Sequence, residues 1–238
     1  MAATHYYLYI VTMTVMHSSA TPPDRKGDPP VWELGPSVDP QTLLAGVDEV
    51  GRGALFGPVV AAAVVMPQSA LPQLVELEVK DSKQLTPLRR RKLVGYLQEL
   101  AFDWRIGYAT AAEIDRINIL QASLRAMRRA VLKLAPRPAL CLVDGRFALP
   151  ELPMEQVPMV GGDRRSPAIA AASILAKVWR DDLIARFAQR YPEYYLASNK
   201  GYGTPAHGQA LQRYGPSPQH RLSFRPCRVV SPHPSSED

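Results

Sequence analysis

Two short apolar runs joined by a glycine-rich turn open the central part of the chain. Residues 43–50 are apolar until the run ends in an acidic pair, and residues 58–66 are apolar throughout. Runs of this length without polar alternation predict strands that are buried on both faces. Because the turn between them is short, we expect the two strands to form an antiparallel hairpin.

Further short strands then alternate with long helical segments. Thr86 with Pro87, and the Thr110/Glu113 pair of a capping box, mark two helix starts. Three further strands are expected over 104–109, 139–143 and 156–160. Four helices are expected over 87–101, 110–134, 166–190 and 205–214. This alternation predicts an α/β fold, a mixed sheet flanked by helices.

The two ends of the chain differ from this pattern. Residues 18–42 are rich in proline, so we expect residues 1–43 to form an irregular N-terminal extension, and residues 230–238 are expected to form a disordered tail. The apolar run 6–16 is too short to span a bilayer and lacks the basic flank of a signal peptide. We therefore expect one folded domain over 44–229, in a cytoplasmic protein that does not enter a membrane.

The charge of the chain points to a polyanionic partner. The formal net charge is +6 over 238 residues, and both predicted ends are acidic, so the central segment is more basic than the average. A basic domain is typical of proteins that bind nucleic acid. With only two cysteines in the chain, a disulfide framework or a cysteine-based zinc site is excluded.

Acidic residues stand where the predicted strands end. Asp48 and Glu49 end the first strand, Asp144 ends the fourth, and Asp163 precedes the long helix. Carboxylates at strand ends lie where open α/β sheets bind ligands. Alternation places the side chains of Asp48 and Glu49 on opposite faces unless the following turn twists the strand.

Clustered carboxylates without histidine or cysteine favour Mg²⁺ or Mn²⁺ over zinc. Two such ions suit phosphodiester hydrolysis. Simpler interpretations also exist, because Asp144 suits a turn and Asp163 suits a helix N-terminus. Asp181 lies four residues after Lys177, as in a helical ion pair. Spacing alone leaves open whether Asp163 or Asp181 completes the cluster.

Several ordered motifs resemble the ribonuclease HII family, the type 2 ribonucleases H. The resemblance covers most of 44–229, and its motifs occur in the family's order. They are GVDEVGRGALFGPVVAAAVV (46–65), DSKQL (81–85), EIDRINILQASLRAM (113–127), VDG (143–145), GGD (161–163), IAAASILAKVWRD (169–181), KGYGTPAHGQAL (200–211) and HRLSF (220–224).

The resemblance implies a fold, an activity and a set of site residues. The implied fold is RNase H-like, with a central mixed five-stranded sheet and a helical C-terminal part. The implied activity is cleavage of RNA in RNA–DNA hybrids and on the 5′ side of single ribonucleotides in duplex DNA, leaving a 3′-hydroxyl and a 5′-phosphate. The implied metal ligands are Asp48, Glu49, Asp144 and, in place of Asp181, Asp163.

The family motifs also imply residues that contact the substrate. Gly51, Arg52 and Gly53 form the family's GRG loop, which reads the ribonucleotide 2′-hydroxyl, and Tyr202 of KGY contacts the junction with DNA. A loop of glycines admits close approach of backbone groups to a sugar, and the 2′-hydroxyl distinguishes RNA from DNA. A plain tight turn is the simpler interpretation of the same glycines.

Other polar residues are candidates for phosphate contacts. Lys83 lies in the DSK motif, next to a basic cluster over 89–92 that also suits a solvated helix face. Asn118 and Gln121 lie one helical turn apart in the predicted helix, where they can hold the backbone of the DNA strand. Weaker candidates are Lys177, Lys200 and Arg221. Structural roles are expected for His207, His220 and Cys141.

Two other functions remain open at this point. One is another RNase H-like nuclease, such as a junction resolvase or a type 1-like hybrid nuclease. The other is a non-catalytic nucleic-acid-binding module, which the positive charge alone supports. A monomer is expected, and no sliding-clamp-binding motif is evident at the C-terminus, so a clamp partner is unsupported.

Overall fold

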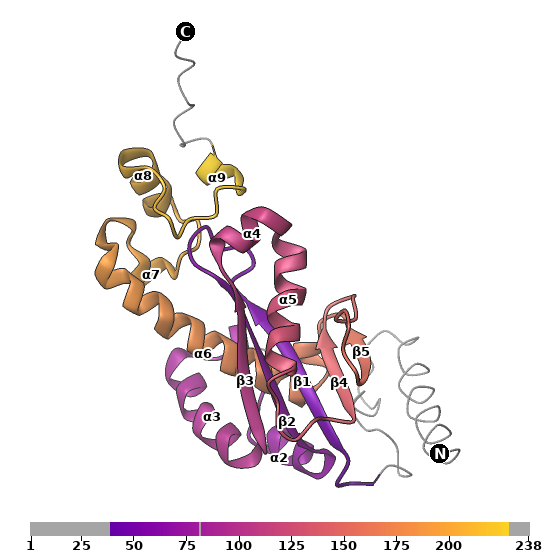
Figure 1. The fold of residues 1–238 in the computed structure, drawn as a ribbon. Helices are drawn as coiled ribbons and strands as arrows, with labels where there is room; N and C mark the ends of the chain where they lie inside the picture. Colours follow the sequence, from indigo (N-terminus) through magenta and orange to yellow (C-terminus); the bar gives the residue numbers. More distant parts are fainter. Residues whose placement is uncertain (1–38, 81, 229–238) are drawn as a thin grey trace.

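The structure is a computed structural model that describes residues 39–80 and 82–228 (Figure 1). Most of the predicted N-terminal extension, Asp81 of the DSKQL motif and the predicted tail lie outside the described residues. Within the described part, the first strand begins at Leu43.

A five-stranded mixed sheet forms the centre of the molecule. The strand order is β3-β2-β1-β4-β5, with β1 antiparallel to β2, β2 antiparallel to β3, and β4 parallel to both β1 and β5. The predicted hairpin and mixed sheet are therefore confirmed. The strands are β1 (Leu43–Val50), β2 (Val59–Pro67), β3 (Asp103–Ala109), β4 (Leu140–Asp144) and β5 (Glu155–Met159).

Helices cover both faces of the sheet. The long helix α6 packs with α2 and α3 on one face, and α5 packs on the other (Figure 1). The α-helices are α2 (Leu71–Glu76), α3 (Pro87–Leu100), α4 (Ala111–Ile117), α5 (Ile119–Val131), α6 (Pro167–Arg190), α7 (Leu196–Asn199), α8 (Pro205–Tyr214) and α9 (Arg225–Arg228). The part of the chain that the structure describes also has four short 3₁₀ helices, η1 (Gln68–Ala70), η2 (Ser82–Gln84), η3 (Gly162–Arg164) and η4 (Pro192–Tyr194).

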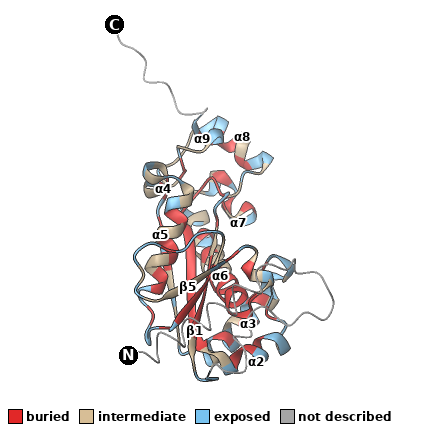
Figure 2. Cartoon of the chain, turned by 90° about the vertical axis from the view of Figure 1, so that its right-hand side faces the viewer, coloured by how far each residue is buried: buried red, intermediate tan, exposed pale blue. Residues whose placement is uncertain are grey.

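The apolar residues of the strands explain this layering. Alternate residues of β1 and β2 enter two separate cores, one beneath α6 and one beneath α5. The central strands and the inner side of α6 are buried, whereas the outer helix surfaces are exposed (Figure 2). At Gly46, an added Cβ would lie 2.0 Å from the Ala168 carbonyl oxygen, so α6 sits directly on β1. This contact fixes the start of α6 against the acidic strand.

A third core joins the C-terminal helices to the end of the sheet. It holds Phe56 of the segment after β1 together with Tyr194, Leu196 and Leu211. The predicted helical C-terminal part is therefore confirmed, and it lies beyond the strand end at which β1 stops (Figure 1).

One predicted helix is wrong in its extent. The segment expected as a single helix over 110–134 is broken at Asn118, which adopts φ 67° and caps α5 with its side chain. Hydrophobic periodicity continues through this break, so the pattern did not show it. In addition, α2, α7 and α9 were not predicted from the sequence. Among the described residues, no helix is long and apolar enough to cross a membrane.

Candidate active site

Three acidic side chains meet where β1 and β4 end side by side. The register pairs Val47 with Val143, so Asp48 and Asp144 are the next residues of two parallel neighbours. One oxygen each of Asp48, Glu49 and Asp144 lies within 4.8 Å of the others. We call these three residues the acidic triad.

The triad forms although its two adjacent members leave β1 in opposite directions. Asp48 is hydrogen-bonded to Ser173 of α6, whereas Glu49 lines a cavity walled by Leu124 and Met127 of α5. Alternation therefore holds, as the sequence predicts. The cluster closes because Asp144, at the end of the neighbouring strand, borders the cavities on both sides.

Burial disfavours the charged forms of two of these carboxylates, Asp48 and Glu49. Asp48 is 5% exposed, and burial, followed by the charges of Glu49 and Asp144, raises its pKa well above the usual range. Burial also raises the pKa of Glu49, although Arg52 opposes this effect through an ion pair of 3.1 Å. Glu49 Oε2 is buried without a hydrogen-bond partner in the described structure. An added cation would stabilise the charged forms of Asp48 and Glu49.

The oxygen atoms of the acidic triad suit a hard divalent cation. All three ligand groups are carboxylates, and Glu49 Oε2 offers an unused acceptor. Oxygen-only sites of this kind suit Mg²⁺ or Mn²⁺. The acidic triad can therefore hold a divalent metal ion.

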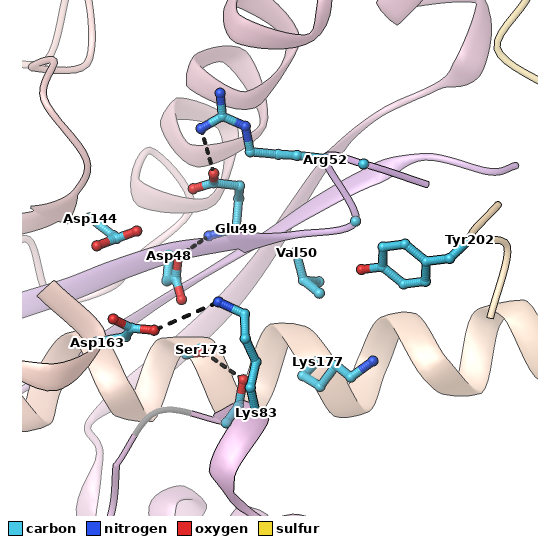
Figure 3. Close-up of a pocket in the computed structure, with 13 residues that line it drawn as sticks. Asp48, Glu49, Val50, Arg52, Lys83, Asp144, Asp163, Ser173, Lys177 and Tyr202 are labelled. Atoms are coloured by element: carbon cyan, nitrogen blue, oxygen red, sulfur yellow. Dashed lines mark hydrogen bonds and ion pairs between the residues drawn. The ribbon is translucent and has the colours of Figure 1, made fainter. Parts of the chain in front are cut away.

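Asp163 lies in the same cavity but outside the triad. It belongs to η3, and its Oδ2 is 4.0 Å from Lys83 Nζ (Figure 3). The preceding Gly162 donates its N–H to Asp144 Oδ1 at 2.7 Å, which ties this turn to β4. In contrast, Asp181 pairs with Lys177 at 2.8 Å, as its spacing on the helix predicts. Geometry therefore favours Asp163 over Asp181 as the fourth acid.

The cavity around the acids has a volume of about 490 Å³. Lys83 lines one side, Ser173 and Lys177 of α6 form the floor, and Arg52 of the GRG loop and Tyr202 lie at the far end (Figure 3). Ser82, Gly51 and Gly53 also line the cavity. The acids and the predicted substrate-contacting loop thus share one cavity.

The GRG loop and the Tyr202 turn are held together. The N–H groups of Leu55 and Phe56 both donate to the Gly201 carbonyl, at 2.8 and 3.2 Å. Gly51 has φ 88°, and an added Cβ would lie 2.2 Å from Nε of the buried Arg180, whereas Gly53 faces open space. The first glycine is therefore required by packing, and the second leaves backbone accessible. The Arg52 side chain turns back to Glu49.

Asn118 and Gln121 do not line this cavity. Asn118 is the N-cap of α5 and accepts the Gln121 N–H at 3.1 Å through its side chain. The two residues lie one turn apart, as expected, but at the start of α5 and not inside one helix over 110–134. Their role on the DNA strand stays a prediction.

The basic cluster over 89–92 turns out to be mostly structural. Arg89 donates to the Leu77 carbonyl, and Arg91 pairs with Asp182 of α6. Arg90 is buried and donates to the carbonyls of Ser82 and Leu85, at 2.7 and 2.6 Å. Arg90 thus supports η2, which carries Lys83, whereas Arg91 and Lys92 are exposed on the helix surface.

Ser173 is a site residue that sequence reasoning missed. Its hydroxyl lies 2.8 Å from that of Ser82 and contacts Asp48, so it links α6, η2 and β1. The available signal was its position as the one polar residue in the stretch AIAAASILA. Its role depends on tertiary packing that the pattern does not encode.

The structural roles expected for three other residues are confirmed. His207 and His220 are buried, and their Nε2 atoms lie 3.0 Å apart. Cys141 is fully buried in β4. The second cysteine, Cys227, lies in the third core.

Comparisons with known proteins agree with this geometry. The family model for ribonuclease HII matches residues 45–227. Ribonuclease HII of Trichormus variabilis is 63% identical over 187 residues, which cover 79% of this chain and 83% of the relative. The crystal structure of the ribonuclease H2 from Pyrococcus horikoshii OT3 superimposes with a TM-score of 0.69 at 30% identity, covering 79% of this chain and 97% of that one.

A second solved structure includes a partner. The complex of PCNA with RNase HII from Archaeoglobus fulgidus has a TM-score of 0.66 at 26% identity, and covers 80% of this chain and 97% of that chain. The fold is thus of the RNase H type, and family membership implies endonuclease activity on RNA–DNA substrates. With a family model over most of the described residues and a highly identical relative, the chain belongs to the ribonuclease HII family.

Proposed function

We propose that the protein cuts on the 5′ side of ribonucleotides in duplex DNA and in RNA–DNA hybrids, leaving a 3′-hydroxyl and a 5′-phosphate. One observation carries this proposal: the acidic triad and the GRG–Tyr202 pair line the same cavity. A single ribonucleotide can therefore place its 5′ phosphate at the acids while its 2′-hydroxyl meets the loop.

In this proposal one group of residues binds the divalent ions and another group contacts the ribonucleotide. Asp48, Glu49 and Asp144 hold the divalent ions, with Asp163 as the fourth ligand. Two such ions, Mg²⁺ or Mn²⁺, supply activation of the attacking water and stabilisation of the leaving oxygen when they are bound. Since these tasks need no protein nucleophile, the acids act as ligands.

The remaining residues orient the strand in the proposed reaction. The exposed backbone of the GRG loop hydrogen-bonds the 2′-hydroxyl, and the Tyr202 ring stacks on the adjoining sugar. Lys83 reaches into the cavity from η2 and contacts a phosphate beside Asp163. Ser173 supports this arrangement by holding both Asp48 and Ser82.

The direct test is a cleavage assay on a DNA duplex with one ribonucleotide, with and without Mg²⁺ or Mn²⁺. Metal-dependent cleavage on the 5′ side supports the proposal, and mapping the product ends checks the chemistry. Cleavage of a long hybrid but not of the single ribonucleotide would instead indicate a type 1-like nuclease. Salt-sensitive binding without metal-dependent turnover would indicate a binding module.

We also propose that residues 44–229 form the catalytic domain of a cytoplasmic monomer. The three cores together include residues of every described strand and every described α-helix, which supports a single domain. Size-exclusion chromatography of the full chain with light scattering tests the monomer. A mass of twice 26.3 kDa would contradict it.

A further inference from the structure

Two arginines are fully buried behind the GRG loop. Arg180 lies in the middle of α6 and Arg221 follows α8, and both are 0% exposed. Within residues 39–80 and 82–228, no carboxylate oxygen forms an ion pair with either guanidinium. A buried charge without a counter-ion is costly, so the fold retains these two residues for a specific purpose or loses stability through them.

The hydrogen bonds of both arginines converge on backbone carbonyls. Arg180 donates to Pro58, Phe56 and Lys200, at 3.3, 3.1 and 3.0 Å. Arg221 donates to the carbonyls of Gly57 and Arg52, at 3.0 and 2.7 Å. Four of the five acceptors thus belong to the segment 52–58, and the fifth directly precedes Gly201 and Tyr202.

The bond to the Arg52 carbonyl determines how the GRG loop faces the cavity. In a trans peptide the C=O and the next N–H point in opposite directions. Because Arg221 draws the Arg52 carbonyl inward, the Gly53 N–H points outward. Gly53 is exposed, and nothing lies within 4 Å of its Cβ direction. The loop therefore presents a backbone donor to a sugar hydroxyl.

Arg180 connects the same loop to Tyr202. Its guanidinium carbon lies 5.5 Å from the centre of the Tyr202 ring, and its Nε lies beneath Gly51. A side chain that contacts both Gly51 and Tyr202 fixes their separation. The two cations also bind consecutive carbonyls, since Arg180 donates to Phe56 and Pro58 and Arg221 donates to Gly57 between them. Burial, and then the charge of Arg180, lower the pKa of Arg221 to about 9.

We infer that Arg180 and Arg221 are positioning residues for ribonucleotide specificity, which hold the GRG loop and the Tyr202 turn in the arrangement that reads the 2′-hydroxyl. This inference rests on the proposed function of the loop. It differs from a purely structural role in its prediction: loss of the hydrogen bonds of either arginine weakens recognition of the ribonucleotide but not general binding of the duplex.

The test uses the full chain and the variants Arg221→Lys and Arg180→Lys, each of which keeps the charge but loses the planar fork. KM and kcat are measured on a duplex with one ribonucleotide, and the matched all-DNA duplex serves as a competitor with its own Ki. For each variant we expect KM for the ribonucleotide duplex to rise about tenfold, the worth of one lost charged hydrogen bond. The Ki of the all-DNA duplex should change less than about twofold, because phosphate contacts dominate it.

Arg190→Lys is the matched control, since Arg190 lies on the same helix, is exposed and stacks on Tyr191. It should leave both constants unchanged. The inference is overturned if KM and Ki rise together in both variants, or if neither constant changes. It is also overturned if circular dichroism shows that both variants fail to fold, because the arginines would then serve stability alone. Failure of the wild type to cleave the ribonucleotide duplex would instead contradict the proposed function.

Discussion

At the scale of single residues, the carboxylate of Asp48 is held where little water can reach it, since the residue is only 5% exposed. It is buried beside two other acids, and its raised pKa shows that the folded chain disfavours its charge without a cation. The same property that destabilises the metal-free protein thus favours capture of an ion.

We therefore predict that Asp48→Asn stabilises the metal-free protein. Asparagine keeps an acceptor for the Glu49 N–H, which Asp48 Oδ1 accepts at 2.6 Å, but removes the buried charge. Thermal unfolding in a chelator should show a gain of about 1 kcal/mol. Cleavage should fall by about 100-fold or more, since ligand loss weakens metal affinity. A variant that cleaves at the wild-type rate would contradict the metal-ligand assignment.

The two glycines of the GRG loop provide a matched pair of substitutions. Gly51→Ala places a methyl group 2.2 Å from Arg180 at a positive φ, whereas Gly53→Ala meets no atom within 4 Å. We expect the first to cost about 1–3 kcal/mol of unfolding free energy and the second less than about 0.5 kcal/mol. Urea titration measures both. Equal losses in the two variants would contradict the steric argument.

Sequence reasoning reached the acids at this scale but not their supports. Asp48, Glu49 and Asp144 were predictable because each lies at the end of a buried strand, where a carboxylate is costly unless it has a function. Ser173 and Arg180 stand inside a helix, and their partners come from segments far away in the chain. Only the packed structure shows those contacts.

At the scale of elements, the break between α4 and α5 was not predictable from periodicity. Apolar residues continue in register on both sides of Asn118, and a left-handed φ at a non-glycine residue has no sequence signature beyond the asparagine itself. By contrast, β1, β2, α3 and α8 were predictable, since glycine turns, prolines and capping residues mark their ends.

The break gives a prediction for Asn118. Asn118→Ala loses the side-chain acceptor of the Gln121 N–H and must hold a positive φ, so it should cost about 1–2 kcal/mol of unfolding free energy. Asn118→Gly tolerates the φ and should cost only a few tenths of a kcal/mol. Chemical denaturation of wild type and both variants measures these differences in the free energy of unfolding. If alanine proves as stable as asparagine, the cap does not contribute.

At the scale of the whole molecule, a histidine pair joins the C-terminal helices to the end of the sheet. His220 contacts Phe56 edge-on and lies against Tyr194, while His207 follows the Tyr202 turn. Burial, and then the neighbouring His207, lower the pKa of His220 to about 4. The pair is therefore stable only in its uncharged form.

This pair makes stability depend on pH. An unfolded histidine has a pKa of about 6.5. Between pH 6.5 and 4, His220 therefore binds a proton in the unfolded chain but stays neutral in the folded protein. The stability that neutral His220 contributes is complete above about pH 6.5 and falls as the pH drops toward 4, by about 3 kcal/mol in total.

Unfolding free energies at pH 7 and pH 5 for wild type and His220→Gln test this dependence. The difference between the two proteins isolates the histidine from the buried carboxylates, whose raised pKa values act in the opposite direction. Wild type should lose more stability than the variant over this range. Parallel losses would show that other groups govern the response.

The parallel pairing of β1 with β4 has a consequence for synthesis on the ribosome. Asp48 and Glu49 leave the ribosome early with the hairpin, but Asp144 and Asp163 follow only after the third strand and the four α-helices α2 to α5. A nascent chain that stops before β4 lacks the strand that completes the acidic triad. An unfinished polypeptide that stops before β4 therefore cannot assemble the acidic triad, and the metal site can form only after the strand that carries Asp144 has been synthesised.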